Sequence, residues 1–352
     1  MALKIVVVAL WVMFVALTRV QSISAQSMDE LYPLAKREGQ VTLYGGGPAA
    51  LYTGWAKLFE EKFPGIKVNV TGGFSNRLAR TIDSQIGAGK VEVDLAMLQT
   101  IQDFVAWKKR GTVATFKPDG FDKIPSAFKD DDGTYAGITV YGIAYAYNPR
   151  LVARGDVAKS AKDFLNPKFM GKIISTYPHD DDITLYLYST IVEKYGWEFM
   201  AGLMKNKPSF VQGHLGVAQK IAAGEFALTF DSVVDLTLSE KNRGGSIELT
   251  IPEDDPMPIW AQTAAVLKGA PHPNAARLYL AWYLSKEQQH RMTRLGRWSP
   301  RADIEPPTGF KPIADYTLAN RFREFMGDEA KVVDLRKKFE AYIGPVKGAE
   351  YR

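Results

Sequence analysis

From Val41 onward, the chain alternates short runs of β-branched and aromatic residues with stretches of helical periodicity. Residues 41–44 and 66–70 are typical of strands. The apolar residues between them recur at helical spacing: Leu51, Trp55, Leu58, Phe59 and Phe63. The pattern repeats as a helix over 78–86, a strand over 93–97 and a helix over 101–109. Such alternation predicts βαβ units with helices flanking a parallel sheet, so we expect an α/β fold.

A second set of elements follows a long β-rich run over residues 137–147, which ends at Asn148-Pro149. Strand and helix patterns then alternate between residues 172 and 251, and another β-rich run covers 260–267. We interpret the two long runs as hinge strands that join two lobes, each a mixed sheet flanked by helices. A chain of 352 residues also exceeds what one hydrophobic core usually organises.

The boundaries of the lobes follow from the two long runs. We expect lobe 1 to comprise residues 27–138 and 261–296, and lobe 2 to comprise residues 139–260 and 297–352. The tail contains one predicted helix, over about residues 315–338, which should pack on a lobe rather than form a third domain.

The first 26 residues have the pattern of an export signal. A short n-region ends at Lys4, an apolar run covers residues 5–17, and small residues precede a cleavage site that we place after Ala25. Thr18 and Arg19 end the apolar run before it reaches the ~20 residues that a membrane-spanning helix needs. We therefore expect a cleaved signal peptide over residues 1–26, export to the periplasm and no membrane insertion. An uncleaved N-terminal anchor is the alternative.

The composition excludes several functions. The chain contains no cysteine, so it has no disulfide, thiol nucleophile, cysteine zinc site or lipid-modified N-terminal cysteine. The formal net charge is +5, and loss of Lys4 and Arg19 with the signal peptide lowers it to +3. So small an excess does not indicate nucleic-acid binding. We expect a monomer without a cofactor.

Six stretches, in order and spacing, match a known family over nearly the whole chain after the signal peptide. They are residues 41–44 (VTLY), 63–68 (FPGIKV), 145–148 (YAYN), 165–173 (LNPKFMGKI), 264–276 (AAVLKGAPHPNAA) and 299–301 (SPR). In these stretches the chain resembles the iron(III)-type branch of the periplasmic extracellular solute-binding proteins. The resemblance implies a type II periplasmic binding fold whose two lobes close on a ligand. It also implies the permease and ATPase of an ABC importer as partners.

Ferric-binding members of this family hold the metal with a histidine in the first loop, a glutamate after the third strand and adjacent tyrosines in the second lobe. At the matching positions this chain has Pro48, Gln99 and the segment 230–233 (FDSV). The hard oxygen ligands that a trivalent cation requires are missing. We therefore expect no metal site, and a small organic ligand rather than bare ferric iron.

Ligands of open α/β sheets bind beyond the carboxyl ends of the strands, beside helix N-termini. Four loops of this chain qualify: residues 45–48, 72–77, 98–100 and 177–182. Their candidate ligand-binding residues are Gly46, Gly47, Ser75, Asn76, Arg77, Gln99, Thr100, His179 and Asp181. The glycines let backbone N–H groups approach a ligand closely.

The candidate residues support two kinds of ligand. Arg77 and Arg301 could clamp a carboxylate or phosphonate, because guanidinium presents a planar fork of donors, or could form surface salt bridges instead. Asp231, at a strand end, could bind an amine together with Tyr44 and Trp260, through a salt bridge and a cation–π contact. Trp260 could equally be buried packing.

The polar loop residues also have a structural alternative. Ser75, Asn76 and Thr100 could bind a ligand or cap helices, and capping is the commoner use of such residues. The acidic run over residues 179–182 could complement the N-terminus of the helix that follows it, or His179 or Asp181 could contact a ligand.

Two other functions are weaker interpretations. Residues 45–50 fit G-x-G-x-x-A after a strand, but no acidic residue follows at the position where a nucleotide-dependent enzyme holds ribose. No G-x-S-x-G or H-E-x-x-H is present, so we predict a binding protein and not an enzyme. A binding protein that reports to a chemoreceptor or sensor instead of a permease stays open.

Overall fold

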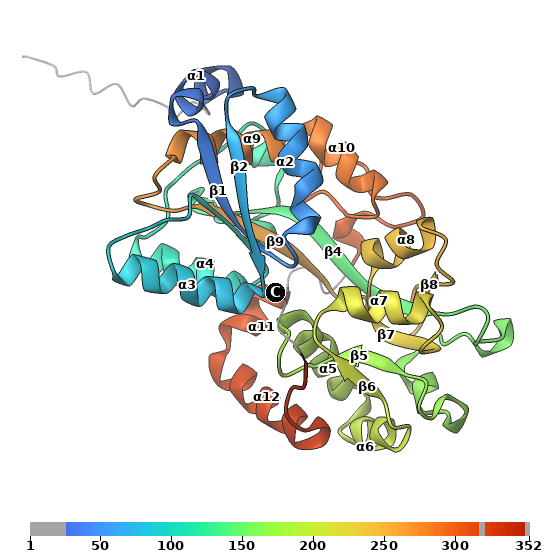
Figure 1. Ribbon diagram of the computed structural model, residues 1–352. Helices are drawn as coiled ribbons and strands as arrows, with labels where there is room; N and C mark the ends of the chain where they lie inside the picture. Colours follow the sequence, from blue (N-terminus) through green and yellow to red (C-terminus); the bar gives the residue numbers. More distant parts are fainter. Residues whose placement is uncertain (1–25, 317–320, 349–352) are drawn as a thin grey trace, which may run out of the picture.

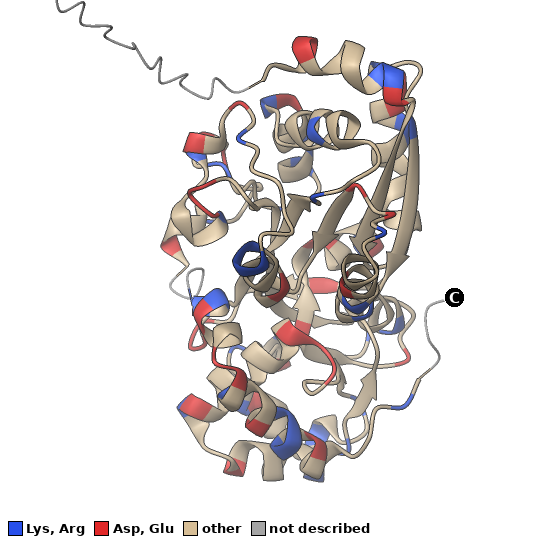
Figure 2. Ribbon diagram, turned by 90° about the vertical axis from the view of Figure 1, so that its left-hand side faces the viewer, with Lys and Arg blue, Asp and Glu red and all other residues tan. Residues whose placement is uncertain are grey.

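The computed structural model describes residues 26–316 and 321–348, and it contains helices packed around one long, curled sheet (Figure 1). The predicted signal peptide lies outside the described residues, apart from Gln26. Figure 2 shows an elongated molecule with basic and acidic residues interspersed over both ends. None of the described helices is long and apolar enough to span a bilayer.

The first βαβ units form as the sequence predicts. Their strands are β1 (Gln40–Gly46), β2 (Lys67–Gly73) and β3 (Leu95–Leu98), and the helices after them are α2 (Ala50–Lys62), α3 (Ser75–Gly87) and α4 (Ile101–Arg110). β1 pairs in parallel with both of the other strands, with Val41 opposite Val68 and Leu43 opposite Leu95. The carboxyl ends of all three strands therefore lie at one edge of the sheet.

Two long strands join this part of the sheet to the rest. They are β4 (Ala136–Tyr147) and β9 (Ile259–Val266), which pair antiparallel with each other. The first half of β4 pairs with β9, and its second half pairs with β7 (Leu228–Val233) and β8 (Glu248–Thr250). The order along the sheet is β2-β1-β3-β9-β4-β7, with β8 also on β4. The two predicted hinge strands are therefore the shared centre of a continuous mixed sheet.

The second half of the fold has a smaller sheet and its own helices. Strands β5 (Ile174–Thr176) and β6 (Ser209–Val211) pair in parallel, and a bridge between Ile173 and Leu228 connects them to β7. The helices are α5 (Asp182–Tyr195), α6 (Glu198–Lys205), α7 (His214–Ala222) and α8 (Val234–Asn242). Short 3₁₀ turns elsewhere cover Phe121–Lys123, Ser126–Phe128, Arg154–Asp156, Ala161–Leu165, Pro167–Phe169 and Ile313–Asp315.

Aromatic side chains hold the outer helices of the first half. The helices are α1 (Met28–Glu38), α9 (Pro273–Tyr283) and α10 (Lys286–Arg294). The ring of Phe59 on α2 is fully buried and meets Tyr279 and Trp282 of α9, with centroids 4.9 and 5.3 Å away. Such ring pairs add about 0.5–1.5 kcal/mol each beyond area burial. Helix α1, which the sequence pattern did not reveal, begins at a capping box formed by Ser27 and Glu30.

The C-terminal tail differs from the single helix predicted over residues 315–338. Two helices are present instead, α11 (Arg321–Gly327) and α12 (Glu329–Ile343). Asp328 separates them, because its side chain accepts a hydrogen bond from Lys331 N at 3.0 Å and so caps the start of α12. α11 packs on both α4 and α5, and α12 packs on α5 and α6.

The segment between α10 and α11 lies beside the first half of the fold. Trp298 bridges to Val140 of β4, and its ring packs on Phe310 and Tyr316. Arg301 donates to the carbonyl oxygen of Leu284 at 3.0 Å. We propose that residues 297–316 belong to lobe 1 rather than to lobe 2, and we retain the other predicted boundaries as a proposal.

Candidate functional site

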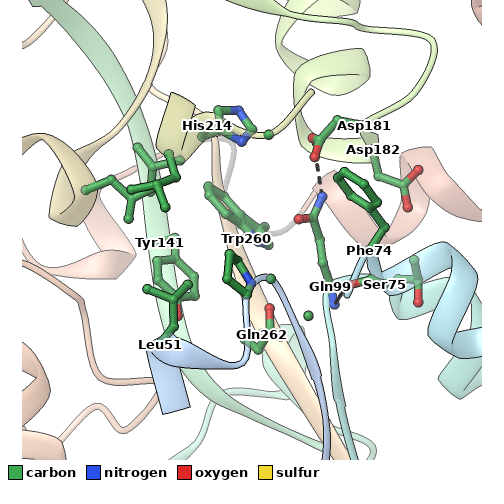
Figure 3. Close-up of a pocket in the computed structure, with 18 of the residues that line it drawn as sticks. Leu51, Phe74, Ser75, Gln99, Tyr141, Asp181, Asp182, His214, Trp260 and Gln262 are labelled. Atoms are coloured by element: carbon green, nitrogen blue, oxygen red, sulfur yellow. Dashed lines mark hydrogen bonds between the residues drawn. The ribbon is translucent and has the colours of Figure 1, made fainter. Parts of the chain in front are cut away.

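A cavity of about 160 Å³ lies where loops from both halves of the fold meet the two hinge strands (Figure 3). One water needs roughly 10–15 Å³ of such volume, so the cavity has room for a small molecule of about ten water volumes. Its lining from the first half is Gly46, Gly47, Pro48, Leu51, Phe74, Ser75, Asn76, Gln99 and Thr100. Its lining from the rest of the chain is Tyr141, Asp180, Asp181, Asp182, Gly213, His214, Leu215, Val233, Asp235, Leu236, Trp260, Gln262 and Arg297.

The first wall is built from the loops after β1, β2 and β3. The hydroxyl of Ser75 accepts a hydrogen bond from Gln99 N at 3.1 Å, which ties two of these loops together. A Cβ on Gly46 would lie 2.4 Å from Ser75 Oγ and 3.0 Å from Gln262 Nε2. Only glycine therefore fits at this position while those two side chains stay in place.

The second wall begins at the N-terminus of α5. Asp181 Oδ1 caps this helix by accepting from the N–H groups of Ile183 and Thr184, at 3.0 and 3.1 Å. Across the cavity, Gln99 Nε2 lies 3.5 Å from the same oxygen, as the dashed line in Figure 3 shows. The capping interpretation is thus confirmed for Asp181, and the same carboxylate lies at the cavity.

Asp182 joins α5 to two other helices. Gln102 of α4 donates to its Oδ2 at 2.9 Å, and Arg336 of α12 forms an ion pair with its Oδ1. Burial raises the pKa of Asp182, although the charge of Arg336 opposes that shift. Contacts from both halves of the fold therefore converge on this helix end.

A buried imidazole and carboxylate form the part of this wall beside α7. His214 Nε2 lies 3.0 Å from Asp231 Oδ1, and Asp231 is completely buried. Burial alone would lower the pKa of His214, but the adjacent negative charge of Asp231 and the hydrogen bond to it raise the pKa to about 9. His214 is therefore an imidazolium at neutral pH, and its charge is matched by Asp231.

Aromatic rings and an ion pair form the back of the cavity, along the hinge strands. The rings of Tyr141 and Trp260 stack with centroids 5.2 Å apart. The guanidinium of Arg297 lies 5.5 Å from the centroid of Tyr141, and its Nε donates to Asp235 Oδ2 at 2.7 Å. The indole N–H of Trp260 and Oδ1 of Asp235 have no hydrogen-bond partner among the described residues.

Eight of the twelve residues predicted for the site line this cavity. They are Gly46, Gly47, Ser75, Asn76, Gln99, Thr100, Asp181 and Trp260. Six come from the ends of β1 to β3 and the loops after them, Asp181 comes from the second half, and Trp260 comes from the hinge strand β9. A ligand-binding role for them is proposed below.

The other four predicted residues lie outside the cavity lining. Arg77 stacks over Phe74 at 5.3 Å, and His179 packs its ring edge-on against Tyr177. Asp231 lies one layer behind the wall, where Ser175, Thr176 and His214 all hydrogen-bond to it.

Arg301 makes its contacts with Leu284 and Asp303 instead. Its Nε and Nη2 each donate to Asp303 at 2.9 Å, and these bonds hold the pKa of Asp303 well below its usual range. The side chain is 3% exposed. Arg301 therefore does not clamp an anion in this cavity, because its guanidinium binds Asp303.

Sequence reasoning missed several residues of the back wall. Tyr141 and Gln262 point from the hinge strands, and Asp235 and Arg297 are 62 residues apart in the chain. The alternation of β4 and β9 could have assigned Tyr141, Trp260 and Gln262 to one side of the two strands, whereas no local pattern predicts the ion pair. Within the described residues, no group of three or more histidine, aspartate or glutamate side chains is arranged to hold a metal ion.

Comparison with known proteins defines the class. Residues 54–317 match the family of bacterial extracellular solute-binding proteins, and the chain belongs to that family. A relative from Haemophilus influenzae, itself uncharacterized, is 23% identical over 322 residues, which cover 86% of this chain and 90% of that protein.

Solved structures of periplasmic binding proteins share the fold. Iron-bound HitA from Pseudomonas aeruginosa is 22% identical, with a TM-score of 0.69 over 85% of this chain and 99% of HitA. AfuA from Actinobacillus pleuropneumoniae, with fructose-6-phosphate bound, is 18% identical, with a TM-score of 0.69 over 87% and 98% of the two chains. The substrate-binding protein of an ABC transporter from Agrobacterium tumefaciens is 14% identical, with a TM-score of 0.73 over 86% and 94%. The chain therefore has the type II periplasmic binding fold that the resemblance predicted.

Proposed function

We propose that this protein captures a small organic ligand in the cavity between its lobes and delivers it to the permease of an ABC importer. The observation that carries the proposal is that the residues lining the cavity come from both halves of the fold. Loops of both halves form its two walls, and the two hinge strands form its back wall. A ligand that touches both halves stabilises the form in which they are closed, and a permease can recognise that form.

The proposed ligand is an organic anion, a phosphonate or an amine, rather than bare ferric iron. Pro48 and Gln99 stand where ferric-binding relatives are expected to place a histidine and a glutamate, and both line the cavity. HitA binds iron and AfuA binds a sugar phosphate, so the shared fold accommodates different ligands. Function in this family depends on the residues of the site and not on the fold alone.

The proposed role is binding without turnover, in the periplasm, as a monomer. Three charged groups of the cavity are engaged in capping or pairing: Asp181 caps α5, His214 pairs with Asp231, and Arg297 pairs with Asp235. This arrangement suits a rigid wall better than a reacting group.

A thermal-shift screen of the mature protein tests the proposal. A ligand at 100 times its dissociation constant adds about 2.7 kcal/mol to the free energy of unfolding, which raises the Tm by several degrees. The screen should include ferric citrate, fructose-6-phosphate, carboxylates, phosphonates and amines.

Two glycine-to-alanine variants then test whether a ligand found in the screen binds in this cavity. Gly46→Ala should weaken binding at least tenfold, because its Cβ displaces Ser75 and Gln262 from the wall. Gly54→Ala is the matched control, since a Cβ there meets nothing within 4 Å. Equal affinity of the two variants would place the ligand elsewhere and contradict the proposal.

A further inference from the structure

Within the proposed function, on which this inference rests, we infer that the ligand is a small organic cation with an apolar body. An ammonium or similar group would lie near Asp181, and the apolar part would lie against Trp260 at the back of the cavity. The charge of the cavity, the pairing of its cationic groups and the apolar character of its walls each support this choice.

The cavity lining carries more negative than positive charge. Four carboxylates line it, those of Asp180, Asp181, Asp182 and Asp235, against the two cationic groups of His214 and Arg297. Behind the walls, the charges of Asp231 and Arg336 cancel, and the guanidinium of Arg77 over Phe74 reduces the excess to one negative charge. A cationic ligand reduces the excess of like charge, whereas an anionic ligand increases it.

Both cationic groups of the lining already have carboxylate partners. Arg297 donates to Asp235 at 2.7 Å, and its side chain is 14% exposed. His214 lies 3.0 Å from Asp231. An anion would have to compete with these short, buried contacts for either group.

Asp181 is the carboxylate best placed for a cation. Its Oδ1 is committed to the N-terminus of α5, but no hydrogen bond from the described residues reaches its Oδ2. The residue is half-buried and labelled beside Gln99 and Phe74 in Figure 3. A ligand N–H group can therefore bind Oδ2 without uncapping the helix.

The remaining lining is mostly apolar. It includes Pro48, Leu51, Phe74, Leu215, Leu236 and Trp260. The ring of Trp260 is stacked on Tyr141, so it is held rigidly at the back of the cavity. Aromatic faces attract cations, and rigid indole and phenyl surfaces also bind the hydrocarbon part of a ligand. A bare ion or a fully hydroxylated ligand would not match the apolar face of Trp260.

An anion is the main alternative, because the N-terminus of α3 has no side-chain cap and faces the same loops. The two arginines that the sequence offered for an anion, Arg77 and Arg301, do not line the cavity. The three consecutive carboxylates at α5 oppose an anion from the other wall. Charge-matched ligands distinguish the two cases.

The experiment titrates the mature protein with pairs of probes that differ only in the sign of charge. Suitable pairs are phenethylamine with 3-phenylpropionate, tryptamine with indole-3-propionate, and putrescine with adipate, each measured by calorimetry. We expect a ring-bearing amine to bind at least tenfold more tightly than its carboxylate partner and more tightly than putrescine. Fructose-6-phosphate and ferric citrate serve as the competing ligand classes.

Two variants assign the charge effect to the cavity. Asp181→Asn keeps an oxygen that can cap α5 but removes the charge, so amine affinity should fall about tenfold while the Tm changes little. Glu198→Gln removes a carboxylate from the first turn of the exposed start of α6 and should leave amine affinity unchanged.

The outcomes of this experiment distinguish failure of the cationic-ligand inference from failure of the proposed solute-binding function. Tighter binding of the carboxylates, of fructose-6-phosphate or of ferric citrate would overturn the cationic ligand but leave a solute-binding protein. Amine binding that Asp181→Asn and Glu198→Gln weaken equally would also overturn the inference. If no probe of any class binds, both proposals fail.

Discussion

Arg297 and Asp235 form an ion pair beside the cavity, with Nε donating to Oδ2 at 2.7 Å and only 14% and 4% of the two side chains exposed. Asp235 lies in the first turn of α8, whereas Arg297 follows α10 and lies over Tyr141 of the hinge strand β4. The pair therefore links two elements that are far apart in the chain at the place where the lobes are joined.

Breaking this pair should be costly. Asp235→Ala leaves a buried guanidinium without its counter-charge, so we expect the free energy of unfolding to fall by about 3–5 kcal/mol in urea titrations. The double variant Asp235→Leu with Arg297→Met should recover most of that loss, since no charge is left buried.

An exposed pair on α12 provides the control. Asp334 and Lys338 lie 2.8 Å apart with more than half of each side chain exposed, so Asp334→Ala should cost less than about 0.5 kcal/mol. A similar cost for Asp235→Ala and Asp334→Ala would show that the buried pair does not contribute as described.

The pair of His214 and Asp231 predicts a pH dependence of stability. The pKa of His214 is about 9 in the folded protein and about 6.5 when unfolded. Because the folded value is the higher one, the stabilisation is fully present below pH ~6.5 and is lost as the pH rises through about 9. The free energy of unfolding should fall over this window by up to about 1.4 kcal/mol per pH unit. His214→Gln should remove that slope, and an unchanged slope would assign it to other groups.

Gly72 tests the loop that supports the first wall. A Cβ at this position would lie 2.2 Å from Ala49 N and 2.6 Å from Gly47 O, which are backbone atoms that cannot rotate away. We expect Gly72→Ala to lower the Tm clearly, by several degrees. Gly54 lies inside α2, and a Cβ there meets nothing within 4 Å. Gly54→Ala should therefore raise the free energy of unfolding by about 0.5–1 kcal/mol. Thermal unfolding of both variants is sufficient, and equal Tm values would contradict the steric argument.

The sequence predicted the regular part of the fold because its signals are local. The alternation from β1 to α4 depends on residue types within windows of a few residues, and the predicted helix over 101–109 corresponds to α4 at Ile101–Arg110. The prediction of one helix in the C-terminal tail was wrong because it also depended on local signals alone. The helical pattern runs across Asp328, and only the capping bond to Lys331 shows that the chain begins a new helix there.

The candidate site was predictable where it depends on strand ends. Ser75, Gln99 and Asp181 were found because loops at the carboxyl ends of strands must converge. The prediction that Arg301 lines the site was wrong. Its position after Ser299-Pro300 does not reveal that its guanidinium binds Asp303. Asp235 and Arg297 were missed because their pairing depends on how α8 packs beside the hinge.

Small-angle X-ray scattering tests the central claim most directly, which is that two lobes close around a ligand. The mature protein should be measured alone and with a saturating amount of the probe that binds best. We expect the radius of gyration to decrease on binding, because contacts from both walls favour the closed form. An unchanged radius of gyration at full saturation would contradict closure of the lobes around the cavity.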